Sequence, residues 1–90
     1  LSLERCYFIE EDAVYFVELL KHNNALQHLS IKDNWLTFVS GKAISEALKH
    51  NSSLRTLNLS GNRFDDRVAK SIGEMLRVNS SLTKLILEYC

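Results

Sequence analysis

Leucine and isoleucine recur along the chain with a period of 28 residues. One column of the repeat contains Leu1, Leu29, Leu57 and Leu85, and a second column, two places later, contains Leu3, Ile31, Leu59 and Leu87. Repetition at such a period indicates stacked units that contribute the same elements of secondary structure. The pattern predicts one domain built of three units, 1–28, 29–56 and 57–84, and the first strand of a fourth unit at 85–90.

Each unit is expected to begin as a strand and to continue as a helix. The first four places alternate between inward-facing leucines and other residues, which predicts a short strand. Farther along, apolar or small residues follow an i, i+3, i+7 spacing, which predicts a helix with one apolar stripe against the strands. The three stripes are Ala13, Phe16 and Leu20; Gly41, Ile44 and Leu48; and Ala69, Ile72 and Leu76. The small residue at the start of each stripe is expected to let helix and strand approach closely.

The segments LQHLSIKDNWL, LRTLNLSGNRF and LTKLILEYC resemble the leucine-rich repeat pattern LxxLxLxxN/CxL. The 28-residue period and the helical second half of each unit are similar to the ribonuclease-inhibitor-like subtype. That subtype also occurs in NOD-like receptor sensor domains, in the Ran GTPase-activating protein and in ciliary proteins. The resemblance implies an α/β leucine-rich repeat solenoid, a right-handed β-α superhelix with a parallel sheet on the concave side and helices on the convex side.

Each unit would leave a leucine-rich edge for its neighbour to cover. Neither end of the sequence carries a polar cap for such an edge, so we expect the chain to be a segment of a longer solenoid. On the opposite face of the helices, acidic and basic residues three places apart are expected to form exposed pairs. These pairs are Glu18/Lys21, Glu46/Lys49 and Glu74/Arg77.

The polar columns of the repeat have structural explanations. Asn34 and Asn62 follow the expected strands, where a buried amide can pair with backbone groups of the turn, so we interpret them as a ladder rather than as catalytic residues. Cys6 and Cys90 occupy the same column three units apart, which places them about 14 Å apart at a strand spacing of about 4.8 Å. A disulfide requires Cα atoms within about 7 Å, so no bridge between them is expected.

Composition and motifs argue against several classes of function. Eleven basic and eleven acidic side chains cancel, which disfavours a nucleic acid or an anionic membrane as the partner. No apolar run approaches the roughly 20 residues that a membrane span requires. The sequence has no glycine-rich phosphate loop, no nucleophile–base constellation and no group of metal ligands. We therefore expect no enzymatic activity, no cofactor, no metal and no small-molecule substrate.

The residues that the repeat does not dictate indicate where a partner would bind. The place at which each strand exits holds Tyr7, Trp35 and Arg63, a rim column of residue types that are enriched in interface hot spots. The concave candidates at the neighbouring places are Glu4, Arg5, Lys32, Asp33, Glu88 and Tyr89. A competing interpretation is that Trp35 only covers the core beside Leu36.

Two apolar pairs stand where the other units have polar or small residues. We expect Phe38 and Val39 either to fill the local core or to form a second contact patch. Val14 and Tyr15 are expected to contact a neighbouring element. The sequence thus predicts a cytoplasmic, non-enzymatic scaffold that binds a protein through its concave face and ascending rim. Two alternatives are a regulator of an enzyme, either a GTPase activator or an inhibitor, and a structural subunit of a cytoskeletal or ciliary complex.

Overall fold

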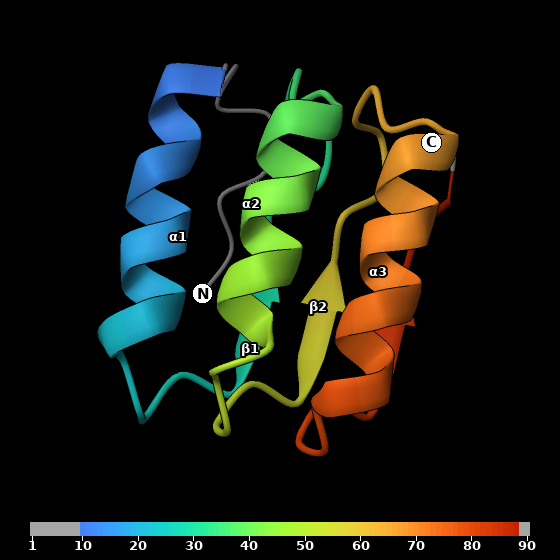
Figure 1. The fold of residues 1–90 in the computed structure, drawn as a ribbon. Coiled ribbons are helices and arrows are strands. Elements are labelled where there is room, and N and C mark those ends of the chain that lie inside the picture. Colours follow the sequence, from blue (N-terminus) through green and yellow to red (C-terminus); the bar gives the residue numbers. More distant parts are fainter. Residues whose placement is uncertain (1–9, 89–90) are drawn as a thin grey trace.

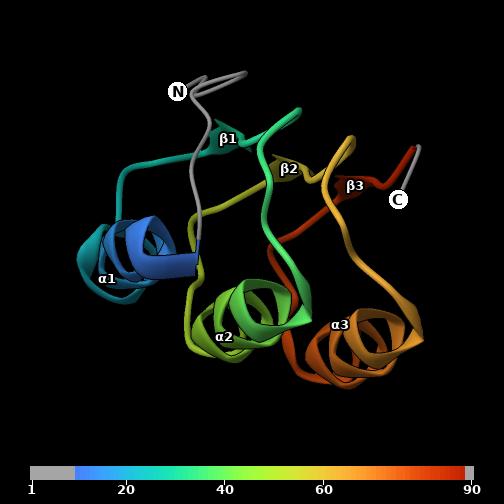
Figure 2. The same cartoon turned by 90° about the horizontal axis from the view of Figure 1, so that it is seen from above.

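The structure is a computed structural model, and it describes residues 10–88 of the chain (Figure 1). A short 3-10 helix, η1 (Glu10–Asp12), precedes three repeats of a helix followed by a strand. In chain order these elements are α1 (Ala13–His22), β1 (His28–Ser30), α2 (Phe38–Leu48), β2 (Thr56–Asn58), α3 (Asp66–Val78) and β3 (Lys84–Ile86). Figure 2 shows two layers, with the strands side by side in one and the helices in the other.

The three strands form a parallel sheet in the order β1-β2-β3. Leu29 is aligned with Leu57, and Leu57 with Leu85, so the 28-residue period of the sequence is also the register of the sheet. Backbone hydrogen bonds continue past the strands, because the N–H of Ile31 donates to Asn58 and that of Leu59 donates to Ile86. The predicted α/β arrangement of parallel strands and helices is confirmed for the described residues.

The core lies between the sheet and the helices. Ile31, Leu36, Ile44 and Leu54 are completely buried there. Leucines at alternate positions of each strand point into this layer because successive side chains of a strand face opposite sides. Burial of each such side chain stabilises the fold by about 1.5–3 kcal/mol relative to exposure.

The predicted apolar stripe is correct for α1 and α2, and in α3 it is correct at Ile72 but wrong at Ala69 and Leu76. In α3 the buried residues are Val68, Ile72 and Met75, whereas Ala69 is exposed and Leu76 is 48% exposed. The reason is the position of α3 in the stack, since the only helix that it packs against among the described elements is α2. The side of α3 that faces α2 is buried, and the opposite side, with Ala69 and Leu76, is not.

The sequence predicts that Gly41 lets its helix approach a strand. In the structure Gly41 instead allows α2 to approach α3 closely. A Cβ atom at Gly41 would lie 2.8 Å from Cγ2 of Val68 and 3.1 Å from Cε1 of Phe64. Real Cβ atoms essentially never approach another heavy atom to within 3.0 Å. The absence of a side chain at Gly41 therefore sets the distance between α2 and α3.

The asparagine column behind the strands is a structural ladder, as predicted. The side-chain amide of Asn34 donates to the carbonyl oxygen of Ile31 at 3.0 Å. The amide of Asn62 donates to Ile31 at 3.1 Å and to Leu59 at 3.0 Å, and its oxygen accepts the N–H of Leu36 at 3.2 Å. Asn62 therefore joins the second unit to the third.

A second ladder lies at the carboxyl ends of the helices. Asn51 donates to the carbonyl oxygen of Leu20 at 2.9 Å, and Asn79 donates to that of Leu48 at 2.7 Å. The oxygen of Asn51 accepts the N–H of Leu54 at 2.8 Å. These amides pair with helix carbonyl groups that have no partner inside their own helix, which explains why the sequence repeats asparagine in this column.

The surface pairs agree with the sequence only in part. Lys49 contacts Glu46 at 3.0 Å as predicted, but Glu18 pairs with His22 at 3.1 Å instead of with Lys21. Each exposed ion pair of this kind contributes about 0.2–1 kcal/mol to the stability of the fold. The prediction about Cys6 and Cys90 lies outside the described residues.

Candidate functional site

Trp35 and Arg63 come from equivalent loops, the first between β1 and α2 and the second between β2 and α3. The guanidinium carbon of Arg63 lies 5.5 Å from the centre of the Trp35 ring, within the range of a cation–π contact. The backbone N–H of Arg63 donates to the carbonyl oxygen of Leu36 at 2.7 Å and so aligns the two loops. The predicted adjacency of Trp35 and Arg63 is confirmed, and Tyr7 lies outside the described residues.

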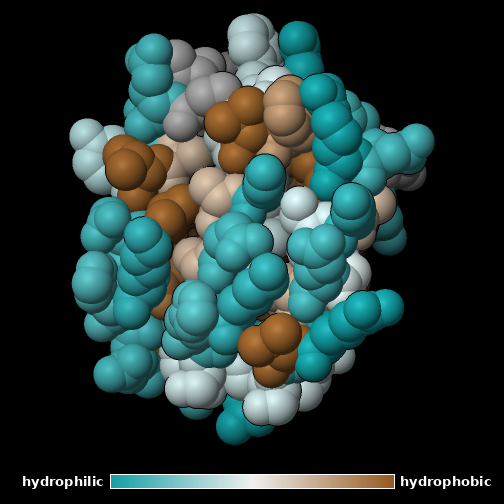
Figure 3. Space-filling model, in the orientation of Figure 1, coloured by the Kyte–Doolittle hydropathy of each residue, from teal (hydrophilic) through white to brown (hydrophobic). Residues whose placement is uncertain are grey.

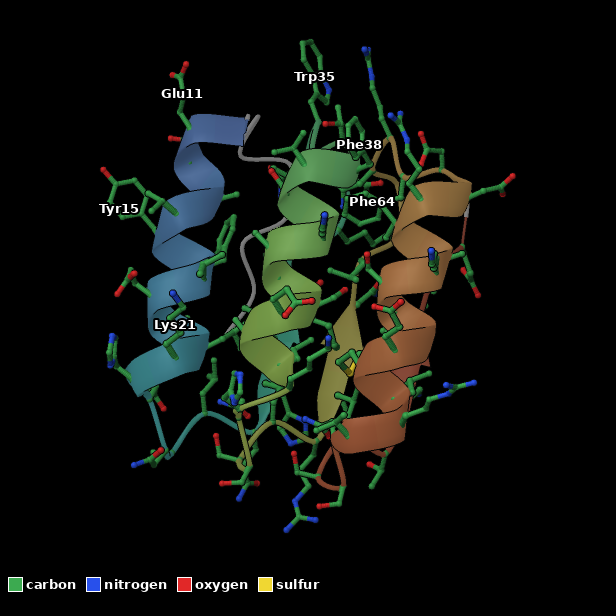
Figure 4. The ribbon with its side chains drawn as sticks, in the orientation of Figure 1. Glu11, Tyr15, Lys21, Trp35, Phe38 and Phe64 are labelled. Atoms are coloured by element: carbon green, nitrogen blue, oxygen red, sulfur yellow. The ribbon has the colours of Figure 1, made fainter. Side chains whose placement is uncertain are left out.

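Trp35 is displayed rather than buried. It is 53% exposed while its neighbour Leu36 is completely buried. Figure 4 shows its ring pointing away from the body of the protein, above the start of α2. The core beneath is therefore closed by Leu36, and this geometry disfavours the interpretation of Trp35 as a cover for the core.

Tight turns position this rim. Asp33 and Gly61 occupy the same column of the repeat, and both have a positive φ, 59° for Asp33 and 72° for Gly61. A Cβ atom at Gly61 would meet Oδ1 of Asp33, and the positive φ also favours glycine there. The N–H of Asp33 donates to Ser60 at 2.9 Å. Together with the Asn62 ladder, these turns hold the rim in one conformation.

The concave face has a hollow of about 290 Å³ over the middle of the sheet. His28, Ser30, Thr56, Asn58 and Ile86 line it from the three strands, together with backbone around Leu29 and Leu57. Nδ1 of His28 lies 2.7 Å from Oγ1 of Thr56. A hollow of this size, lined by small polar side chains and by Ile86, is suited to one or two side chains of a partner.

The predicted concave candidates lie beside this hollow rather than in it. Lys32 and Asp33 are half-buried and Glu88 is exposed, and none of the three is among the residues that line the hollow. His28 and Thr56 line the hollow but were not predicted from the sequence. The two-residue alternation of a strand places residue 28 on the same face as residue 30, so this signal could have located them. Glu4, Arg5 and Tyr89 lie outside the described residues.

Phe38 and Val39 play different roles. Phe38 is half-buried, packs against the core and carries the guanidinium of Arg67 over its ring at 3.4 Å from the centroid. Val39 is 53% exposed. Phe38 therefore fills the local core, as one interpretation expects. Val39 lies on the surface, and a contact patch there stays a prediction.

Asp65 caps α3 and fixes the orientation of Arg67. Its carboxylate accepts the backbone N–H of Arg67 at 2.9 Å and the side-chain Nη2 at 2.7 Å. The guanidinium of Arg67 lowers the pKa of Asp65 below its ordinary value of 3.8, and the carboxylate raises the pKa of Arg67 in turn. This agrees with the capping role expected of acidic residues that precede a helix.

The described residues contain no group of three or more histidine, cysteine or acidic residues that could hold a metal ion. No helix in this part of the chain has both the length and the apolar character to cross a membrane.

Val14 and Tyr15 are 53% and 72% exposed on α1, so no neighbouring element in the described part of the chain buries them.

Part of the chain is similar to a leucine-rich repeat family, and the chain has the fold of a solved structure. Residues 50–73 match the family described as Leucine Rich repeat. The solved structure of "Leiomodin-1 Actin-Binding Site 2 (ABS2)" resembles this chain with a TM-score of 0.93 at 23% identity, over 99% of this chain and 52% of that one. At that identity the likeness shows the fold, and this chain spans about half the length of the leiomodin chain. A search among curated proteins found no match.

Proposed function

We propose that the chain is a non-enzymatic protein-binding module whose contact surface is the rim formed by Trp35 and Arg63. The observation that carries this proposal is a tryptophan that is 53% exposed and held 5.5 Å from an arginine. Exposing so large an apolar ring is unfavourable unless a partner covers it, and Trp and Arg dominate the energy of many interfaces. Lys32, Asp33 and Glu88 then form the polar border of the contact. Tyr7 as a further residue of the rim, and Glu4, Arg5 and Tyr89 as concave contacts, remain predictions from the sequence.

Actin is the first partner to test. The likeness to a leiomodin actin-binding site supports a cytoskeletal partner, and it favours a structural role over the regulation of a GTPase or another enzyme. The 28-residue register of the sheet supports the ribonuclease-inhibitor-like subtype within the leucine-rich repeat proteins. A cytoplasmic location and membership of a larger complex follow from the same proposal.

The test uses Trp35 as its own reporter, because it is the only tryptophan in the chain. Binding of a partner over the rim is expected to change its fluorescence emission. Trp35→Ala is expected to weaken binding by at least about 1 kcal/mol, which is about fivefold in Kd by calorimetric titration. Tyr15→Ala is the matched control, since it removes an aromatic ring that is 72% exposed on α1. Equal affinity of Trp35→Ala and the parent protein, with actin or another captured partner, would contradict the proposal.

We also propose that the units of this chain are part of a longer solenoid. Leu20 and Leu48, each 1% exposed, are covered by a following unit, whereas Leu76 of the same column is 48% exposed and Leu87 is 38% exposed. A further leucine-rich unit would cover both. Leu76→Asp is therefore expected to cost several times more stability in a protein that contains the next unit than in the 90-residue chain. An equal loss in both would contradict the proposal.

A further inference from the structure

A groove runs between α2 and α3 on the side of the helices that faces away from the sheet. It has a volume of about 270 Å³. Its lining is Phe38, Lys42, Arg67, Lys70, Ser71 and Glu74, which comprises three cationic side chains and one anionic side chain. Figure 3 shows that hydrophilic side chains cover most of this helical face, with separate hydrophobic spots among them. The groove is distant in the fold from the concave hollow, which lies on the other face of the sheet.

The two lysines of the groove are available to a ligand. Lys42 and Lys70 occupy one column of the repeat on adjacent helices, whose axes are expected to lie about 8–10 Å apart. Both are exposed, and among the described residues neither ammonium group makes an ion pair or a hydrogen bond.

Arg67 and Phe38 pack against each other and both line the groove. The guanidinium carbon of Arg67 lies over the Phe38 ring, 3.4 Å from its centroid. Asp65 binds Nε and Nη2 of Arg67, so Nη1 retains its two N–H donors among the described residues. Asp65 offsets much of the charge of Arg67, which leaves the two lysines as the main cationic groups. Figure 4 shows Phe38 at the end of α2 beside α3.

The equivalent positions on α1 and α2 show that the repeat does not require these cations. There the column of Lys42 and Lys70 begins with Val14, and the column of Arg67 holds Val39. Val14 and Val39 are each 53% exposed. The helical face thus carries an apolar region next to a basic one, although the chain as a whole has no net charge.

We infer that the groove between α2 and α3 binds an acidic peptide segment of a protein partner, with leucine-type side chains among its carboxylates. The carboxylates pair with Lys42 and Lys70, and the apolar side chains lie on Phe38 and Val39. A nucleic acid fits less well, because Glu74 and Asp65 interrupt the track of positive charge that a phosphate backbone requires. Trp35 is not among the residues that line the groove, so the module has two contact surfaces.

The experiment measures the fluorescence anisotropy of a labelled peptide of about 12 residues, rich in glutamate and leucine, with the whole chain. The matched probe is the same peptide with glutamine in place of every glutamate. Lys42→Gln combined with Lys70→Gln is expected to raise the Kd about fivefold, the size expected for two exposed ion pairs. Lys21→Gln combined with Lys84→Gln removes the same charge from exposed sites on α1 and β3 and is expected to change the Kd less than about twofold.

Trp35→Ala should leave peptide binding unchanged, which separates this inference from the function proposed for the rim. All four lysines are exposed, so the variants should keep the melting temperature of the parent protein. Equal weakening by the two lysine pairs, equal binding of the glutamine peptide, no binding at all, or tighter binding of single-stranded RNA would each overturn the inference.

Discussion

Replacement of Asn62 by alanine removes a buried amide that joins two units. The amide donates to Ile31 at 3.1 Å and to Leu59 at 3.0 Å, and its oxygen accepts the N–H of Leu36 at 3.2 Å. Asn62 is 4% exposed and Leu36 is completely buried, so bulk water does not reach the groups that the substitution leaves behind.

The size of the effect follows from those three bonds. The N–H of Leu36 loses its acceptor inside the core, which costs about 1–3 kcal/mol. The carbonyl oxygen of Ile31 still accepts a hydrogen bond from Asn34 at 3.0 Å. Loss of the hydrogen bonds to Ile31 and to Leu59 therefore lowers the stability by only about 0.5–1.5 kcal/mol each. A total of about 3 kcal/mol is expected, which corresponds to a decrease of about 12–24 °C in Tm for a domain of this size.

Urea unfolding followed by circular dichroism measures this loss. The control is Asn24→Ala, an exposed asparagine in the turn after α1, which is expected to change stability by less than about 0.5 kcal/mol. If Asn62→Ala loses no more stability than Asn24→Ala, the ladder does not hold the units together and the reasoning is wrong.

Three further predictions concern the helices. Gly41→Ala is expected to cost about 1–3 kcal/mol, because the added methyl would lie 2.8 Å from Cγ2 of Val68. Gly73→Ala is expected to stabilise the chain by about 0.5–1 kcal/mol, since a Cβ there meets no described atom within 4 Å and alanine favours a helix. Thermal melting compares the two, and a stabilising Gly41→Ala would show that α2 and α3 separate easily. Because Arg67 lowers the pKa of Asp65, this carboxylate stabilises the fold above its unfolded pKa of about 3.9 and ceases to do so as the pH falls through the lower folded value. Urea unfolding at several pH values should show the parent protein losing its advantage over Asp65→Asn in acid, and a difference independent of pH would contradict this.

The candidate site was partly predictable. Trp35 and Arg63 occupy one column of the repeat, so their adjacency follows from the period, and the structure adds that the tryptophan is exposed. The stacking of Arg67 on Phe38 was not predicted, because the two residues belong to different columns of different units. Their contact depends on how closely α3 approaches α2, which the missing side chain of Gly41 decides.

By itself the sequence determined the repeating unit, the register of the sheet and the places of both asparagine columns. Each of these depends on residues 28 places apart that meet the same surroundings, so periodicity alone is sufficient to locate them. For α3, the tertiary structure alone decided which side of the helix is buried. Ala69 and Leu76 fit the apolar pattern as well as Gly41 and Leu48, yet they are exposed, because burial requires a neighbour and a pattern in one helix does not say on which side the neighbour stands.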